Sequence, residues 1–369
     1  MEKHVKTAKL PITKIKPGMT LTEDVYNAAD QMILSAGTVL SDHSISRLKF
    51  YSIREVTVSY EVKPKAQVSL KSEAERLGSY TESVRRSKDF ADFATAYKDS
   101  VLSIEKRMRS FVSGKSSLDT NALLECVSNI YQKVSSQGQL FDMLMCIRNL
   151  DDITFVHGLN VAIIATAFSE WLNLSREDSD ALILSGLLHD IGKLTIPEAI
   201  LKKKGALTAD EYKIIKGHSR AGYNLLKDLN VDPRISIVAL QHHERADGSG
   251  YPDGLVGSHT DNFAKIIAIA DVYDAMTAAR CYRGPICPLE VLNTFESEGL
   301  TKYDPKYLLT FMDHVISTYL NQYVLLSNGE VAEIVMLNKH SPARPYVRLK
   351  DGQCIDLSAE RSITIVGIV

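Results

Sequence analysis

The segment ALILSGLLHDIGKL (residues 181–194) decides how this sequence is interpreted. Its apolar residues recur at helical spacing up to Leu188, and His189 and Asp190 follow at once. A charged aspartate at the end of an apolar helix is costly to bury without a partner, and a bound metal ion would remove that cost. An HD pair is also compatible with an ordinary capped helix end, so residues elsewhere in the chain must distinguish the two interpretations.

Further ligand-type side chains occur at the ends or in the interiors of other predicted helices. Six of the ten histidines fall between residues 157 and 259. Helices that converge with histidines and carboxylates inside a bundle are a common way to build a metal site from nitrogen and oxygen ligands. The candidate ligands outside the HD pair are His157, His218, His242, His243, Asp271 and Asp274. The last two are three residues apart and share a helix face, so one can bind a metal while the other orients a neighbour or a substrate group.

Apolar spacing between residues 151 and 320 predicts a helical bundle. The expected helices lie near residues 155–172, 178–190, 208–228, 232–243, 261–279, 288–298 and 305–320. Residues 66–150 are interpreted as a linker followed by a helical stalk or hairpin, which could form a homodimer through residues 88–150. The alternative is that this helical segment packs on the domain that follows it.

Both ends of the chain have different patterns. Residues 1–65 alternate short strand-like runs with turns and include a possible short helix at Ile45 to Phe50, which indicates a small α+β domain. Residues 321–369 contain short apolar runs separated by Asn328-Gly329 and Asp351-Gly352, which are hairpin signals. The sequence therefore predicts a mainly α protein with a small α+β N-terminal domain and a short β-rich C-terminal unit.

Composition limits the class of protein. The chain has 369 residues, 45% of them hydrophobic, and a formal net charge of -2, so no global basic field favours a DNA or RNA polymer as a partner. Five cysteines without a CxxC pair argue against a disulfide framework or a cysteine zinc site. No apolar stretch is long enough for a membrane span and the first residues lack an apolar signal region, so a cytoplasmic protein is expected.

Several motifs, in order, resemble those of the HD-GYP family of phosphodiesterases. HHERADGSGYPDGL (242–255) is similar to the family's HHE and GYP signature, LLHDIGKL (187–194) to its HD motif, and ADVYDAMTAARCYR (270–283) to the helix that follows. The resemblance covers roughly residues 150–316. It implies an HD-type helical bundle that hydrolyses cyclic di-GMP to linear pGpG, and it leaves open whether the product is pGpG or GMP.

The resemblance also implies a two-metal site. His157, His189, Asp190 and Asp271 would hold one metal, and Asp190 would bridge to a second metal held also by His218, His242 and His243. A hydroxide between the metals would attack phosphorus. The mixed nitrogen and oxygen ligands suit two divalent ions, iron or manganese first, with zinc, nickel or magnesium as alternatives.

The resemblance extends to substrate contacts. Lys193, three residues after Asp190, would contact the scissile phosphate and take part in catalysis, although it also fits a solvated lysine at a helix end. Asp274 would contact the ligand or support the site, and Tyr251 would offer a ring to a base or brace the loop. The implied substrate contacts are Lys193, Asp274, Arg280, Arg283 and Tyr251.

Two departures from the family pattern modify these expectations. Ile153 stands where members with a third metal have a glutamate, so two metals are predicted rather than three. Ala246 stands where an aromatic residue is common, which widens or weakens the predicted ligand pocket. Three alternative functions stay open. One is a cyclic GMP-AMP phosphodiesterase. Another is a non-catalytic receptor that signals to partner proteins through the N-terminal region. The third, an HD phosphohydrolase for other nucleotides, is disfavoured by the GYP segment.

Overall fold

A computed structural model describes most of the chain, and it divides into two units, Met1–Arg76 and Leu77–Val369. The described residues are 5–12, 15–26, 32–41, 44–45, 48, 53, 55–61, 80–147, 153–203, 205, 207–278 and 287–369.

The first unit contains two small antiparallel sheets. Strands β1 (Val5–Pro11), β5 (Glu55–Glu61) and β2 (Thr20–Leu21) form a sheet in the order β1-β5-β2, and β3 (Val25–Tyr26) pairs with β4 (Met32–Leu34). Val56 and Val58 alternate with polar residues along β5 and are buried in the core of the unit. Most of the expected helix from Ile45 to Phe50 lies outside the described residues.

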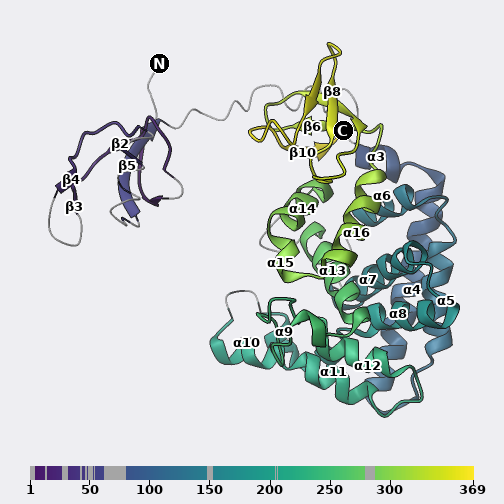
Figure 1. Ribbon diagram of the computed structural model, residues 1–369. Helices are drawn as coiled ribbons and strands as arrows, with labels where there is room; N and C mark the ends of the chain where they lie inside the picture. The colour runs from purple at the N-terminus through teal and green to yellow at the C-terminus, as the bar shows by residue number, and fades with distance from the viewer. Residues whose placement is uncertain are drawn as a thin grey trace. The chain divides into compact units, whose positions relative to one another are not determined.

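The second unit begins with a run of helices that lead into the bundle (Figure 1). These are α3 (Tyr80–Arg85), α4 (Lys88–Val112), α5 (Thr120–Tyr131), α6 (Gln137–Ile147), α7 (Ile153–Trp171) and α8 (Arg176–Leu188). Val101, Ile104 and Met108 of α4, which suggested a stalk, are buried in the same core as α7. This segment therefore packs on the domain that follows it, as in the alternative interpretation. A homodimer through residues 88–150 stays a prediction.

The bundle continues through shorter helices. They are η2 (Ile191–Thr195), α9 (Glu198–Leu201), α10 (Ala209–Lys216), α11 (His218–Leu226), α12 (Pro233–Gln241), η3 (Gly257–His259), α13 (Asn262–Thr277), α14 (Pro288–Thr294), η4 (Phe295–Gly299), α15 (Leu300–Lys302) and α16 (Pro305–Ser317). The capping box of Thr208 and Glu211 is present at the start of α10. The prediction of a single helix over residues 208–228 is wrong. Helix α10 ends at Lys216, and α11 begins at His218, directly after Gly217.

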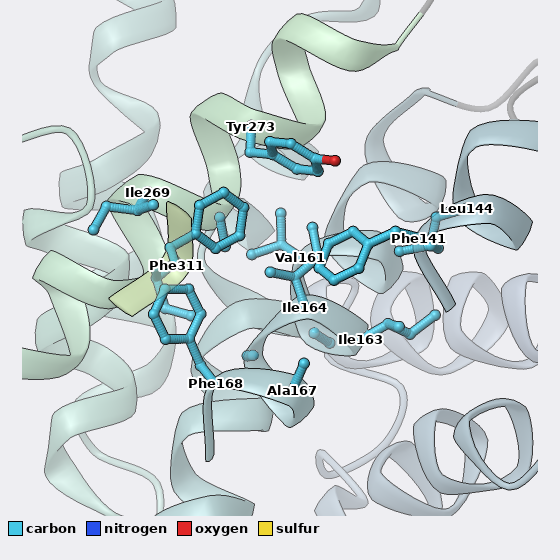
Figure 2. Close-up of a cluster of buried hydrophobic side chains, with 14 of the residues drawn as sticks. Phe141, Leu144, Val161, Ile163, Ile164, Ala167, Phe168, Ile269, Tyr273 and Phe311 are labelled. Carbon is cyan, nitrogen blue, oxygen red and sulfur yellow. The ribbon is translucent and has the colours of Figure 1, made fainter. Parts of the chain in front are cut away.

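An aromatic and aliphatic core holds the bundle together (Figure 2). Helices α7 and α13 are apolar over most of their surfaces, as expected for helices that are surrounded by others. Phe311 of α16 lies 5.5 Å from Phe168 of α7 and 4.9 Å from Tyr273 of α13, between ring centroids. This core fixes α7 and α13, the two long helices that carry predicted ligands.

A five-stranded antiparallel sheet closes the second unit. It has the order β10-β6-β7-β8-β9. The two predicted hairpins are confirmed: β6 pairs with β7 across Asn328-Gly329, and β8 pairs with β9 across Asp351-Gly352. Both glycines have positive φ angles, 94° and 89°. The strands are β6 (Tyr323–Leu326), β7 (Val331–Met336), β8 (Tyr346–Leu349), β9 (Cys354–Asp356) and β10 (Ile365–Ile368).

The predicted fold class is confirmed, since the chain is mainly helical with small sheets towards both ends. The predicted domain limits at residues 65, 150 and 320 stay predictions. Buried residues of the C-terminal sheet, such as Val324, belong to the same hydrophobic core as the helices. Among the described residues, no helix combines the length and apolarity needed to cross a membrane.

Candidate metal centre

Asp190 lies at the centre of a buried cluster of histidines. It follows the end of α8 and precedes η2, and only 3% of the residue is exposed. Its Oδ1 atom lies 3.2 Å from Nε2 of His218 and 3.7 Å from Nε2 of His242. Its Oδ2 atom lies 3.3 Å from Nε2 of His189 and 3.9 Å from Nε2 of His157. One carboxylate therefore faces four imidazoles from four parts of the chain.

The cluster separates into two groups that could each hold a metal ion. The first group is Asp190, His218, His242 and His243, and the second is His157, His189 and Asp271; within each group the ligand atoms lie within 4.8 Å of one another. Asp190 also faces members of the second group, so it lies between the two. The structure thus brings together all seven residues that the family resemblance implied as ligands, although their role as ligands stays a prediction.

The helices themselves orient three of the histidines. Nδ1 of His189 donates to the carbonyl oxygen of Gly186 over 2.7 Å, and Nδ1 of His218 donates to that of Ile215 over 2.7 Å. Nδ1 of His242 lies 3.1 Å from the carbonyl oxygen of Val238. With Nδ1 protonated in each ring, a neutral imidazole presents its Nε2 lone pair to the cluster.

These lone pairs converge on the carboxylate of Asp190. Nε2 of His218 and Nε2 of His242 are 3.2 Å apart, and both face Asp190. Nε2 of His189 and Oδ1 of Asp190 are buried and have no hydrogen-bond partner among the described residues. Such an arrangement is repulsive unless a cation lies within it. The donor set of neutral imidazoles and carboxylates therefore fits a divalent metal ion.

Ionisation of the metal-free site agrees with this donor set at His242 and His243, whereas His157 carries a proton that a bound metal ion would displace. Burial lowers the pKa of His242 to about 4, and burial together with His242 lowers the pKa of His243, so both rings are neutral at pH 7. Burial opposes the charge on Asp190, but Lys193 and His189 hold its pKa well below the ordinary value. Burial opposes the charge on His157, but hydrogen bonds with Asp271 and Asp274 raise its pKa to about 10.

Asp274 supports His157 from behind. Nδ1 of His157 donates to Oδ2 of Asp274 over 2.7 Å, while Nε2 lies 2.9 Å from Oδ1 of Asp271. Asn160 donates from Nδ2 to the other oxygen of Asp274 over 2.9 Å, and Asp274 is only 2% exposed. Of the two predicted roles for Asp274, support of the site is the one that these contacts favour. The sequence reasoning did not single out Asn160, which lies one helical turn after His157.

The turn that carries Lys193 packs closely against the helix that carries His218. Nζ of Lys193 contacts Oδ2 of Asp190, and the lysine side chain is 24% exposed. A Cβ atom placed on Gly192 would lie 2.0 Å from the carbonyl oxygen of His218 and 2.5 Å from the amide nitrogen of Gly222. The missing side chain of Gly192 therefore sets how closely η2 and α11 approach.

The GYP loop is held by a buried glutamate that the sequence reasoning did not assign. Glu244 is 3% exposed, and its two carboxylate oxygens accept the backbone N–H groups of Asp253 at 2.8 Å and Leu255 at 2.9 Å. The ring of Tyr251 stacks on His243 with centroids 4.5 Å apart. The loop thus covers one face of His243, a candidate ligand. The position of Glu244 directly after His242 and His243 was the sequence signal that could have identified it.

Some predicted residues cannot be placed. Arg280 and Arg283 lie outside the described residues, as does the side chain of Ile153 at the start of α7. The prediction of two metals rather than three, and the predicted effect of Ala246 on the ligand, therefore stay predictions.

Comparisons with known proteins give a consistent picture. Residues 130–307 match the family described as "HD domain". A cyclic di-GMP phosphodiesterase response regulator, RpfG, of Xanthomonas campestris is 46% identical over 122 residues, which is 32% of each chain. A 3'3'-cGAMP-specific phosphodiesterase of Vibrio cholerae is 42% identical over 164 residues, covering 43% of this chain and 38% of that protein.

A solved structure covers more of the chain. The protein Bd1817 of Bdellovibrio bacteriovorus, described as an HDG"Y"P protein, aligns with 83% of this chain and 98% of its own, with a TM-score of 0.49 and 18% identity. This chain spans about a third of the length of the first two curated relatives.

Proposed function

We propose that this chain, which matches the HD domain family over residues 130–307 and is similar to cyclic dinucleotide phosphodiesterases, is a metal-dependent phosphodiesterase that hydrolyses cyclic di-GMP to linear pGpG. The observation that carries the proposal is the position of Asp190 between two groups of buried ligand atoms. A single carboxylate shared by two cations is the arrangement used for phosphoester hydrolysis by paired metals.

Two divalent ions are proposed, held by the two groups and joined through Asp190, with iron or manganese as the metals. When bound, such ions act as Lewis acids that lower the pKa of water and neutralise the charge that develops on phosphate oxygens. Main-chain carbonyls accept the Nδ1 protons of His218, His242 and His189, so these rings direct their Nε2 atoms into the cluster. His157 presents Nε2 to the same cluster because Asp274 binds its Nδ1 proton.

Lys193 and Tyr251 are proposed to meet the substrate. The ammonium group of Lys193 contacts Asp190 and is partly exposed, so it can donate to an oxygen of the scissile phosphate at the edge of the cluster. In the reaction, water adds to phosphorus and the bond to the ribose 3′ oxygen breaks. A 5′ phosphate and a free 3′ hydroxyl group result. Tyr251 stacks on His243 and carries an apolar ring beside the ligands, where it can brace the loop or contact a base.

Cyclic GMP-AMP is the second candidate substrate. The specific support is the relative described as 3'3'-cGAMP-specific, which is 42% identical to this chain over 164 residues. Base discrimination depends on residues around the ligand rather than on the metal cluster, and the same two-metal chemistry serves both substrates. A receptor that binds the nucleotide without hydrolysis is the remaining alternative.

The test uses protein purified without oxygen and loaded with Fe²⁺ or Mn²⁺. It is incubated with cyclic di-GMP and with 3'3'-cGAMP, and the products are separated by chromatography. Turnover of cyclic di-GMP to pGpG is expected. Faster turnover of 3'3'-cGAMP would change the substrate assignment, tight binding without turnover would favour the receptor, and a protein that takes up no metal would refute the proposal.

A substitution of Lys193 tests its proposed role. Lys193→Met is expected to lower kcat/KM about 100-fold, as for the loss of one charge-stabilising donor, while both metals stay bound. Lys202→Met is the matched control, because Lys202 also pairs with an acidic side chain, Glu198, but on the exposed helix α9. Equal activity of the two variants would remove Lys193 from the mechanism.

A further inference from the structure

A buried tyrosine on α4 is connected to the candidate ligand His157 through two other side chains. The hydroxyl group of Tyr97 lies 2.6 Å from Oδ1 of Asn160, and Nδ2 of Asn160 lies 2.9 Å from Oδ1 of Asp274. Oδ2 of Asp274 lies 2.7 Å from Nδ1 of His157. Tyr97 is 0% exposed and Asn160 is 1% exposed, so this chain of hydrogen bonds runs through the protein interior.

The direction of every hydrogen bond in the chain follows from its members. Asn160 presents its NH₂ group to Asp274, and Nδ2 donates to Oδ1 of that carboxyl group. The carbonyl oxygen of Asn160 then faces Tyr97, whose hydroxyl group must donate. All four groups are therefore consistent with one arrangement. Asp274 accepts hydrogen bonds from His157 and Asn160, and Nε2 of His157 faces the cluster.

Helix α4 lies outside the segment that matches the HD domain family, which begins at residue 130. It nevertheless packs against α7, which carries His157, and against η2, which carries Lys193. The hydroxyl group of Tyr97 also lies 3.3 Å from the carbonyl oxygen of Val156, the residue before His157. A residue from outside the matched segment therefore contacts the immediate surroundings of a candidate ligand.

We infer that Tyr97 is a positioning residue for the metal held by His157, acting through Asn160 and Asp274. The inference rests on the proposed metal site. The hydroxyl group of Tyr97 fixes the amide orientation of Asn160, the amide fixes Asp274, and Asp274 holds the ring and the tautomer of His157. Without that hydroxyl group, the carbonyl oxygen of Asn160 would be buried without its donor, and the amide would be free to turn away from Asp274.

The expected effect of Tyr97→Phe is selective. Loss of a partner that orients a metal-bound histidine typically weakens metal binding about 10- to 100-fold, so a loss at the lower end, about 10-fold, is expected for a group further along the chain. Only one of the two metals is affected, because His157 belongs to the group with His189 and Asp271 and not to the group around His218.

The experiment measures the binding of Mn²⁺ to the full chain by calorimetric titration, together with the melting temperature of the metal-free protein. Tyr131→Phe is the matched control, because the hydroxyl group of Tyr131 also contacts α7, donating to Glu170 over 2.7 Å near the other end of that helix. Tyr97→Phe is expected to weaken one metal about 10-fold and leave the second within twofold, whereas Tyr131→Phe changes neither.

A second pair of variants tests the route. Asn160→Ala is expected to weaken the same metal, and Tyr97→Phe added to Asn160→Ala is expected to cause no further loss, because the hydroxyl group acts through the amide. Unchanged binding in Tyr97→Phe, equal weakening of both metals, or additive losses in the double variant would overturn the inference. A wild-type protein that binds no Mn²⁺ would overturn the proposed metal site itself, so the two failures are distinguishable.

Discussion

Substitution of Gly192 by alanine is expected to move Asp190 and His218 apart within the candidate metal centre. Gly192 lies in η2, between Asp190 and Lys193, and faces the start of α11. An added Cβ atom would lie 2.0 Å from the carbonyl oxygen of His218, 2.5 Å from the amide nitrogen of Gly222 and 2.9 Å from the carbonyl carbon of His218. All three neighbours are backbone atoms, so no flexible side chain can move aside.

The magnitude follows from that geometry. Real Cβ atoms essentially never approach other heavy atoms within 3.0 Å, so η2 and α11 must move apart by at least about 1 Å. Forcing extra volume into a packed interior costs about 1–3 kcal/mol. The same displacement changes the distance between Asp190 and His218, now 3.2 Å between Oδ1 and Nε2. A misplacement of about 1 Å in a catalytic site lowers the rate about 100-fold.

The assay compares Gly192→Ala with Gly138→Ala. Gly138 lies in α6, where an added Cβ would meet Thr318 at an ordinary 3.6 Å, so that variant should match the wild type in stability. Thermal unfolding of the metal-free proteins and metal content after loading are measured for both. A Gly192→Ala variant that melts with the wild type and keeps both metals would refute the account of close packing between η2 and α11.

Three further results are expected. Glu244→Gln loses the carboxylate that accepts two partly buried hydrogen bonds from the amides of Asp253 and Leu255, so it should destabilise the loop that stacks Tyr251 by about 1–3 kcal/mol and speed proteolysis between residues 246 and 255. Arg234→Met removes the partner that holds the pKa values of Asp178 and Asp232 below the ordinary 3.8. Depressed carboxylate pKa values stabilise the fold above pH 3.8, so the difference in melting temperature from wild type should be present at pH 7 and be lost below pH 3.8, as the pH falls through the depressed pKa values. Finally, Mn²⁺ at 100 times its Kd should stabilise the metal-free protein by about 2.7 kcal/mol, and a chelator should reverse the effect; an unchanged melting temperature would contradict metal binding by the folded state.

The sequence predicted the helical bundle and the identity of the clustered residues because both are recorded locally. Apolar spacing marks α7, α8 and α13, and the side chains of His157, His189 and Asp271 interrupt or end those apolar runs. The order of the motifs then indicated which histidines would meet. Hairpins at Gly329 and Gly352 were predictable for the same reason, since two residues determine each turn.

Features that depend on contacts between distant segments were not predictable. The end of α10 before Gly217 was missed because the residues of α10 and α11 both have ordinary helical spacing, so the sequence reads as one helix. The connection from Tyr97 to Asn160 spans 63 residues, and neither residue belongs to a recognisable motif. Glu244 could be seen in the HHE run, but only the folded loop reveals that its oxygens bind the amides of Asp253 and Leu255.

The way in which the histidines are oriented has a consequence for how the site diverges among related chains. His189, His218 and His242 bind main-chain carbonyls, which exist whatever side chains surround them, so substitutions nearby leave the directions of their lone pairs intact. His157 is aimed by a side chain, Asp274, which single substitutions can replace. The directions of these three rings are therefore robust to sequence drift, whereas that of His157 is open to tuning. Selection for a different metal would act first on the group that contains His157.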